Sequence, residues 1–492
     1  MGKDHGLSHR PDIVADPSFL QNVIEVIFMK TAIHNSLENT AIELFGLDPS
    51  VIQHISTAHG IDQILVEVTL RPDFPPCPRC GSHRIVVYNY TPRAITHSVL
   101  QDHRCTLIYN ARRYKCKDCH RTYGENNPFS LKKQRISLQT SEAILRDLRS
   151  PNETFASVAA RHHVSATTAM KIFDMNVSYP QANRLCRVLQ LDETYSFKSD
   201  DSKYVCMLLD YDRQIPVDVL PSRRKEYLAG YFRQFPRSER EKVEYIASDM
   251  YRPYRDMAST FFPKAVFAVD RFHVTQEYTR QLNKVRIRVM KGTRKGSSEY
   301  YLLKHQYELL SVRPDARNKD RKQILDPSAP RFYVHGLKRR MNKYELLNEL
   351  LEISPDLEEA YRFRNRLSEY FREGTLSTAE EELRTLIVGL DSTGVAELQD
   401  FANTLRTWFK EVVNSFHIVK REYIAEARTG KVYVKNHRLT SSMIENRNKI
   451  IKMIKHNSNG YSNWERFRNR VLYVLSNGPE DGHPDLTDRP VN

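Results

Sequence analysis

The amino-acid sequence predicts a multidomain α+β protein, and three observations support this prediction. The chain has 492 residues, more than one hydrophobic core usually holds, so several domains are expected. Four cysteines in two Cys-x-x-Cys pairs mark a small N-terminal domain. Between residues 185 and 275, short apolar runs alternate with helical patterns, which is typical of an α/β sheet.

The composition favours a protein with a polyanionic partner. The formal net charge is +15, and such an excess of cations favours phosphate contacts that release counterions. A merely basic, soluble protein is the alternative. No run of about 18 apolar residues occurs, so no membrane-spanning helix is expected. The segment MGKDHGLSHRPD lacks the apolar centre of a signal peptide, so a cytoplasmic protein is expected.

The two Cys-x-x-Cys pairs predict a structural zinc site. Cys77 with Cys80 and Cys116 with Cys119 supply four thiolates in two tight turns, the ligand set of tetrahedral zinc. Gly81 follows the first pair, where such a turn often requires a positive φ. The long gap between the pairs holds enough strand-like sequence for an extra hairpin. Four cysteines leave no open coordination position; buried or redox-active thiols are the alternative.

The segment that follows predicts a helix-turn-helix. SLQTSEAILRDLRS is one amphipathic helix, a second opens at Phe155, and the turn falls near His163. Ser165 is a natural N-cap for the third helix. On this candidate recognition helix the exposed positions are Ala166, Thr167, Met170 and Lys171. A three-helix packing unit is the alternative, and the basic charge with the adjacent cysteines favours DNA binding.

Three predicted strands of the α/β region end in carboxylates. Asp192 and Glu193 follow RVLQL, Asp249 follows VEYIAS, and Asp270 follows KAVFAV. Alternation places Asp192 and Glu193 on opposite faces, so one of them points into a given site. Open α/β sheets carry their sites at these strand ends. The order of elements is that of the ribonuclease-H-like fold; each acid alone could also be solvated or cap the next helix.

A final helix, predicted from about residue 443, carries a further acid. Glu445 shares one face with Lys449, Lys452 and His456 at helical spacing. A carboxylate beside several cations suits a metal site bordered by DNA phosphates, with Lys449 and Lys452 as DNA-binding residues. Two alternatives stay open: a capping box with Ser442, and an ordinary surface pair with Lys449.

Separated acids of this kind suit two-metal chemistry on phosphodiesters. Two divalent ions roughly 3.5–4 Å apart stabilise the attacking and the leaving oxygen. Mg²⁺ is a hard cation that prefers carboxylates and water to cysteine or histidine. The sequence therefore favours two catalytic Mg²⁺ ions in addition to one structural Zn²⁺.

Taken in order, the motifs resemble the bacterial insertion-sequence DDE transposases of the ISL-three type. The motifs are CPRCGS, ARRYKCKDCHRTY, a helix-turn-helix, LDE, SDMYRPY, FPKAVFAVDRFHV and MIENRNKIIKMIKHNSNGYSN, from about residue 75 to 475. The resemblance implies Asp192, Asp249 and Glu445 as the catalytic, magnesium-binding acids. It implies a supporting role for Asp270 and His273, with Asp270 as the alternative second acid.

The resemblance also implies the domain organisation. We expect a helical N-terminal region (1–60), a zinc ribbon (61–127), a helix-turn-helix DNA-binding unit (128–182), a ribonuclease-H-like catalytic domain in two pieces (183–275 and 441–475), a helical insertion (276–440) and a disordered tail (476–492).

The implied function is transposition of DNA. The protein would bind the inverted-repeat ends of its own element, then cleave and transfer strands, with double-stranded DNA ends and target as partners. A homo-oligomer on DNA and a nucleoid-associated prokaryotic location are expected, with no membrane association. The alternatives are a catalytically inactive, transposase-derived DNA-binding protein and a zinc-ribbon transcription regulator.

Overall fold

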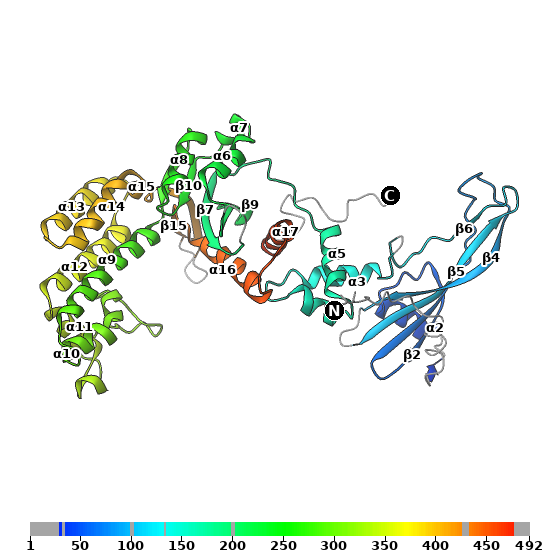
Figure 1. The fold of residues 1–492 in the computed structure, drawn as a ribbon, viewed down its shortest axis with the longest axis horizontal. Coiled ribbons are helices and arrows are strands. Elements are labelled where there is room, and N and C mark those ends of the chain that lie inside the picture. The colour runs from blue at the N-terminus through cyan, green and yellow to red at the C-terminus, as the bar shows by residue number, and fades with distance from the viewer. Residues whose placement is uncertain are drawn as a thin grey trace, which may run out of the picture. The chain divides into compact units, whose positions relative to one another are not determined.

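The chain folds into two units, Met1–Ser178 and Tyr179–Asn492, in the computed structural model (Figure 1). The structure describes residues 29–31, 35–98, 103–131, 134–197, 202–425 and 432–476. Most of the predicted disordered tail, residues 477–492, lies outside the described residues, as does the stretch 1–28. Within the described part of the chain, no helix is long and apolar enough to cross a bilayer.

The first unit is built on a six-stranded sheet. Its strand order is β1-β2-β3-β5-β4, and β6 pairs with the far part of β5. Strands β3 and β5 run parallel, and the other pairs are antiparallel. The elements are β1 (Met29–Thr31), α2 (Asn35–Leu44), β2 (Ile52–His59), β3 (Gln63–Leu70), β4 (Ile85–Thr96), β5 (Arg104–Cys116) and β6 (Thr122–Gly124).

The predicted helical character of residues 1–60 is wrong for residues 52–59. These residues form β2, which pairs along its length with β3. Ile52 and Ile55 are buried in the sheet core, and their β-branched side chains suit a pleated surface. The sheet of the N-terminal unit therefore begins before residue 61, the expected start of the zinc ribbon.

The long gap between the cysteine pairs forms one extended hairpin. Two stretches that the sequence suggests as separate strands join into β4, with an irregularity in its pairing to β5 between Val87 and Asn89. The first cysteine pair precedes β4, and Cys116 is the last residue of β5. The hairpin therefore carries both cysteine turns at the same end, as Ile85 pairs with Cys116.

Three helices follow at the predicted positions: α3 (Leu138–Asp147), α4 (Phe155–Arg161) and α5 (Ala166–Asn176). Ser165 caps α5, and its hydroxyl accepts the backbone N–H of Thr168. The turn passes through His163, whose φ is +53°. Phe155 and Phe173 pack edge to face in the core, with ring centroids 5.4 Å apart. The local chemistry of the sequence thus predicts this unit well.

The second unit contains a five-stranded mixed sheet of order β11-β10-β7-β8-β9. Strands β7, β8 and β9 form an antiparallel meander, and β10 runs parallel to both β7 and β11. Its elements are β7 (Val188–Tyr195), β8 (Tyr204–Asp210), β9 (Ile215–Leu220), α6 (Lys225–Arg233), α7 (Arg237–Arg240), β10 (Tyr245–Ser248), α8 (Arg252–Phe261) and β11 (Val266–Val269). Apart from the four-residue helix α7, the order is three strands, a helix, a strand, a helix and a strand.

Helices cover both faces of this sheet, so alternate residues of β8 belong to different cores. Val205, Met207 and Leu209 are buried with α16 (Ser442–Asn457) and α17 (Trp464–Leu475). Cys206 and Leu208 are buried in the core that includes α6 and α8. The helix predicted to start near residue 443 is α16. A further helix, α17, follows it and packs on the same face of the sheet.

A large insertion separates the two pieces of the sheet domain, and it is mostly helical as predicted. Its first helix begins at Arg271 rather than at residue 276, and Figure 1 shows its helices gathered at one end of this unit. It ends in a β-hairpin. The elements are α9 (Arg271–Gly292), α10 (Ser298–His305), β12 (Phe332–Val334), β13 (Arg339–Met341), α11 (Lys343–Glu352), α12 (Pro355–Glu373), α13 (Ala379–Ser392), α14 (Ala396–Thr407), α15 (Phe409–Asn414), β14 (Ile418–Ala425) and β15 (Val432–Arg438), with short 3-10 helices at Tyr307–Ser311 and His335–Leu337.

Candidate active site and zinc centre

The four predicted zinc ligands converge at the end of the β4–β5 hairpin. The sulfurs of Cys77 and Cys119 are 3.6 Å apart, those of Cys80 and Cys116 are 3.7 Å apart, and all four lie within 4.8 Å of one another. Tetrahedral zinc with Zn–S bonds of about 2.3 Å separates its sulfurs by roughly 3.8 Å. The cluster therefore fits one zinc ion without rearrangement.

The local backbone favours thiolates at this cluster. Gly81 has a φ of +71°, as the tight turn requires, and its N–H donates to the carbonyl of Cys77 at 2.8 Å. Backbone N–H groups, that of Cys119 first, lower the pKa of Cys116 to about 7. In the second cysteine turn the residue with a positive φ is His120. A non-glycine residue there adopts the left-handed conformation that Gly81 adopts in the first turn.

Asp192 and Glu193 lie on opposite faces of β7, as alternation predicts. Asp192 faces α16, where the Asn448 side-chain amide donates to its Oδ2 at 2.8 Å. Glu193 faces the other side, where Arg223 pairs with it and the Tyr254 hydroxyl donates to its Oε2 at 3.1 Å. Glu193 is therefore compensated by protein groups, whereas Asp192 shares its face with the last predicted acid.

Burial raises the pKa of Asp192 to about 6, and the nearby charge of Glu193 acts in the same direction. Burial also raises the pKa of Asp249, which follows the end of β10; His273 opposes this rise and the charge of Asp192 adds to it. The two buried carboxylates therefore repel each other when both are ionised, and this repulsion costs free energy. A divalent cation relieves such a cost.

Glu445 lies in the first turns of α16 with Oε1 buried and without a hydrogen-bond partner. The helix N-cap is Ser441, which makes no side-chain capping bond, so the alternative of a capping box with Ser442 is not formed. His273 Nε2 lies 3.9 Å from Glu445 Oε1 and is likewise buried without a hydrogen-bond partner. Burial raises the pKa of Glu445, His273 opposes the rise, and the charge of Asp270 adds to it.

Asp270 is occupied by backbone and hydroxyl donors. It is 2 % exposed and caps α9 by accepting the N–H of Phe272 at 2.6 Å. Its other oxygen accepts the Thr440 hydroxyl at 2.8 Å and the backbone N–H of Ser441. These bonds join the end of β11 to the residues just before α16, 170 positions later. Asp270 therefore fixes the start of the helix that carries Glu445.

The structure brings the predicted acids around His273, which acts electrostatically on Asp192, Asp249 and Glu445. Among the described residues, only the cysteine cluster places three or more ligand atoms within 4.8 Å of one another, so the carboxylates are spaced more widely than a single-ion site. The buried Oε1 of Glu445 has no hydrogen-bond partner, and a carboxylate oxygen is the donor type that Mg²⁺ prefers. Two ions would spread their ligands in this way.

Pattern analysis missed three residues of this site. Asn448 comes one helical turn after Glu445, Arg223 forms an ion pair with Glu193, and the Tyr254 hydroxyl donates to Glu193. The spacing of Asn448 from Glu445 could have indicated a shared face. No local signal links Arg223 to a residue 30 positions earlier.

The predicted DNA-binding side chains have different exposures. Thr167 and Lys171 on α5 are exposed, and Ala166 and Met170 are half-buried. On α16 both Lys449 and Lys452 are exposed. Lys449 donates to Asn446 rather than pairing with the acid at 445.

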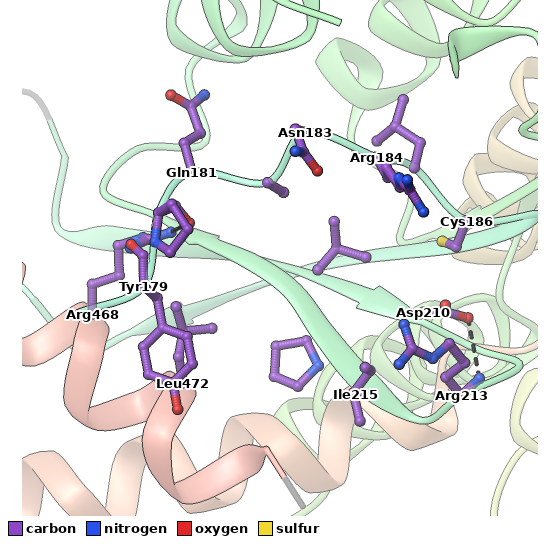
Figure 2. Close-up of a pocket in the computed structure, with 15 residues that line it drawn as sticks. Tyr179, Gln181, Asn183, Arg184, Cys186, Asp210, Arg213, Ile215, Arg468 and Leu472 are labelled. Carbon is purple, nitrogen blue, oxygen red and sulfur yellow. Dashed lines mark hydrogen bonds between the residues drawn. The ribbon is translucent and has the colours of Figure 1, made fainter. Parts of the chain in front are cut away.

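A cavity of about 550 Å³ lies between residues 179–186, the β8–β9 turn and α17 (Figure 2). It is lined by none of the predicted catalytic acids. Arg468 on its wall donates to the carbonyl of Tyr179 at 2.8 Å and to Asp218 at 2.8 Å, which attaches the start of this unit to α17. This cavity is therefore separate from the carboxylate site.

Comparison with known proteins gives two family matches and one similar transposase. Residues 189–433 match a transposase family of the ISL3 type, and residues 73–119 match the zinc finger of the transposases of IS204, IS1001, IS1096 and IS1165. The first match contains Asp192 and Asp249 and ends before α16. The chain is 23% identical over 397 residues to the transposase for insertion sequence element IS1001 of Bordetella parapertussis, covering 80% of this chain and 86% of that protein. With a zinc-finger match in the first unit and a transposase match in the second, the chain belongs to the ISL3-type DDE transposases.

Proposed function

We propose that this chain binds the inverted-repeat ends of its insertion sequence and catalyses strand cleavage and strand transfer with two Mg²⁺ ions. The proposal rests on one observation above all: Asp192 on β7 lies beside β10, whose end precedes Asp249, and against α16, which carries Glu445 and whose Asn448 donates to Asp192 at 2.8 Å. In this proposal the mixed sheet with α16 is a ribonuclease-H-like catalytic domain.

The three acids would hold the ions, and the ions would supply Lewis-acid activation of water and stabilise the leaving 3′-oxygen. Asn448 orients Asp192 by donating to its Oδ2. Asp270 positions Glu445 through its bonds to Thr440 and Ser441. His273 lies near Glu445, with its Nε2 3.9 Å from Glu445 Oε1. A freed 3′-hydroxyl held in the same place would attack the target phosphodiester.

End recognition would reside in the first unit. In the proposal α5 is the recognition helix, because Thr167 and Lys171 are exposed on a helix whose other face is fixed in the core. The zinc centre clamps the end of the β4–β5 hairpin and stabilises the domain that carries this helix. Pairing of two ends would require a homo-oligomer on DNA.

The decisive experiment is cleavage of DNA that carries the element's own ends, in Mg²⁺. Asp249→Ala is expected to abolish cleavage and leave end binding intact, because the change removes a metal ligand of the second unit. Asp256→Ala is the matched control, since Asp256 is a half-exposed carboxylate on the same domain that pairs with Lys225 at 3.2 Å. Retained cleavage in Asp249→Ala, with loss in Asp270→Ala, would make Asp270 the second acid.

The same assay tests the alternative function. A wild-type chain that binds the ends and cleaves nothing in Mg²⁺ would instead be a catalytically inactive, transposase-derived DNA-binding protein. A chain that binds no end would contradict both.

A further inference from the structure

A cavity of about 1020 Å³ lies at the base of the β14–β15 hairpin, bordered by the end of α12 and the start of α16. Its lining contains no aspartate or glutamate. Six cationic side chains line it: Arg271, Arg313, Arg372, Arg421, Lys435 and Arg438. Such a concentration of one sign of charge is costly unless an anion occupies the cavity.

The protein compensates only part of this charge. Asp315 pairs with Arg313 at 3.3 Å and with Arg372 at 2.5 Å, and Glu373 pairs with Arg372 at 2.6 Å. Glu422 lies opposite Lys435 in the hairpin. Within the described residues, Arg271 and Arg421 form no ion pair with a carboxylate. Arg438 donates to two backbone carbonyls, and burial together with the charge of Arg271 lowers its pKa. Arg271 and Arg438 therefore repel each other in the cavity wall.

The cavity adjoins the carboxylate site. Thr440 and Ser442 form part of its wall, and Thr440 is the residue that donates to Asp270. Arg271 directly follows Asp270, and Ser442 opens the helix that carries Glu445. A polyanion in the cavity would thus be held next to the catalytic acids.

We propose that this cavity binds the phosphodiester backbone of a DNA strand that enters the catalytic site, so that the hairpin and α12 of the insertion form one wall of the substrate channel. This inference rests on the proposed function. Pockets that enclose a drug-sized ligand measure about 300–1,000 Å³, so an isolated phosphate would fill little of the space. A backbone with several successive phosphates matches both the volume and the number of cations.

The expected effect follows from counterion release. Each lost phosphate contact reduces the slope of log K against log salt by about 0.9. If wild type and variant bind equally at 1 M salt, the variant then binds roughly eightfold more weakly than the wild type at 0.1 M salt. Removing two cations should therefore lower affinity on the order of 60-fold at 0.1 M salt and reduce the slope by about 1.8.

The test uses the full-length chain and a duplex that carries the element's end, with binding followed by fluorescence anisotropy over a range of salt. The test variant is Arg421→Ala with Lys435→Ala, because both side chains line the cavity. The control is Lys420→Ala with Lys410→Ala, since these exposed lysines lie on β14 and α15 outside its lining. Tryptophan fluorescence unfolding checks that both variants fold as the wild type does.

Loss of affinity and slope in the test variant alone is the expected result. Equal salt slopes for both variants, with wild-type binding and cleavage intact, would overturn this inference and leave the proposed function standing. Inorganic phosphate at low millimolar concentration is tested as a competitor of the labelled duplex. If it displaces the labelled duplex as well as unlabelled duplex does, the cavity is a small-anion site, and this inference is also overturned. A wild-type chain that binds no duplex would overturn the proposed function first.

Discussion

Replacing Asp192 by asparagine should stabilise the second unit at neutral pH while removing cleavage. The carboxylate is buried and keeps a raised pKa of about 6, so ionising it costs folding free energy. The amide carries no charge and has nearly the same shape. Asn448 has a buried, unpartnered Oδ1, so a flip of its amide lets it accept from the new side chain. The backbone N–H of Glu193, which donates to Asp192 Oδ1 at 2.8 Å, keeps an acceptor.

The magnitude follows from the two pKa values. The difference between about 6 and the ordinary value of 3.8 corresponds to about 3 kcal/mol. Because the folded-state pKa lies above the unfolded one, the native state binds more protons between these values, and wild-type stability falls as pH rises from about 4 to 6. The advantage of Asp192→Asn should be close to zero at pH 4 and reach up to about 3 kcal/mol above pH 7.

The assay is urea unfolding followed by tryptophan fluorescence at several pH values. Both tryptophans of the chain, Trp408 and Trp464, belong to the second unit, so the signal reports on that unit. The buffer contains neither magnesium nor a chelator, so that zinc is retained. A difference between variant and wild type that does not change with pH would refute the electrostatic reasoning. Added Mg²⁺ should then stabilise the wild type more than the variant.

Three further predictions concern other parts of the structure. Cys77→Ser should lower the zinc content of the purified protein below one per chain and cost folding of the first unit with end binding; metal-free wild type by elemental analysis would contradict the zinc site. Asp270→Asn should cost about 1–3 kcal/mol in the tryptophan unfolding assay, because a buried acceptor for Thr440 and Ser441 is weakened, and cleavage should fall while end binding persists; unchanged cleavage would contradict its positioning role. Lys171→Ala should weaken end binding with an unchanged unfolding midpoint, since this side chain is exposed on α5; unchanged affinity would contradict the recognition-helix assignment.

Much of the local structure could be predicted because its causes are local. Alternation along β7 separates Asp192 from Glu193 in the structure as it does in the sequence pattern. The hydroxyl of Ser165 caps α5 because an N-cap needs only residues three positions apart. The cysteine turns were predictable for the same reason, since each requires only a short loop and Gly81.

Other features depend on contacts between distant segments, and these were not predictable. Residues 52–59 form a strand because they pair with β3. The pattern of residues within the segment does not predict this pairing. Asp270 resembles a third strand-end acid, yet its oxygens are used by Thr440 and Ser441. Only the folded chain reveals that this acid is engaged while the buried Oε1 of Glu445 has no hydrogen-bond partner.

The bonds of Asp270 also bear on how such a protein can change in size. Asp270 precedes the long insertion, and Thr440 and Ser441 follow it. Their hydrogen bonds hold the two ends of the insertion together, so the insertion is a closed loop. Doubling the length of a closed loop costs only about 0.6 kcal/mol. The closure entropy of the insertion therefore depends only weakly on its length, while its base keeps the spacing between the sheet and Glu445 constant.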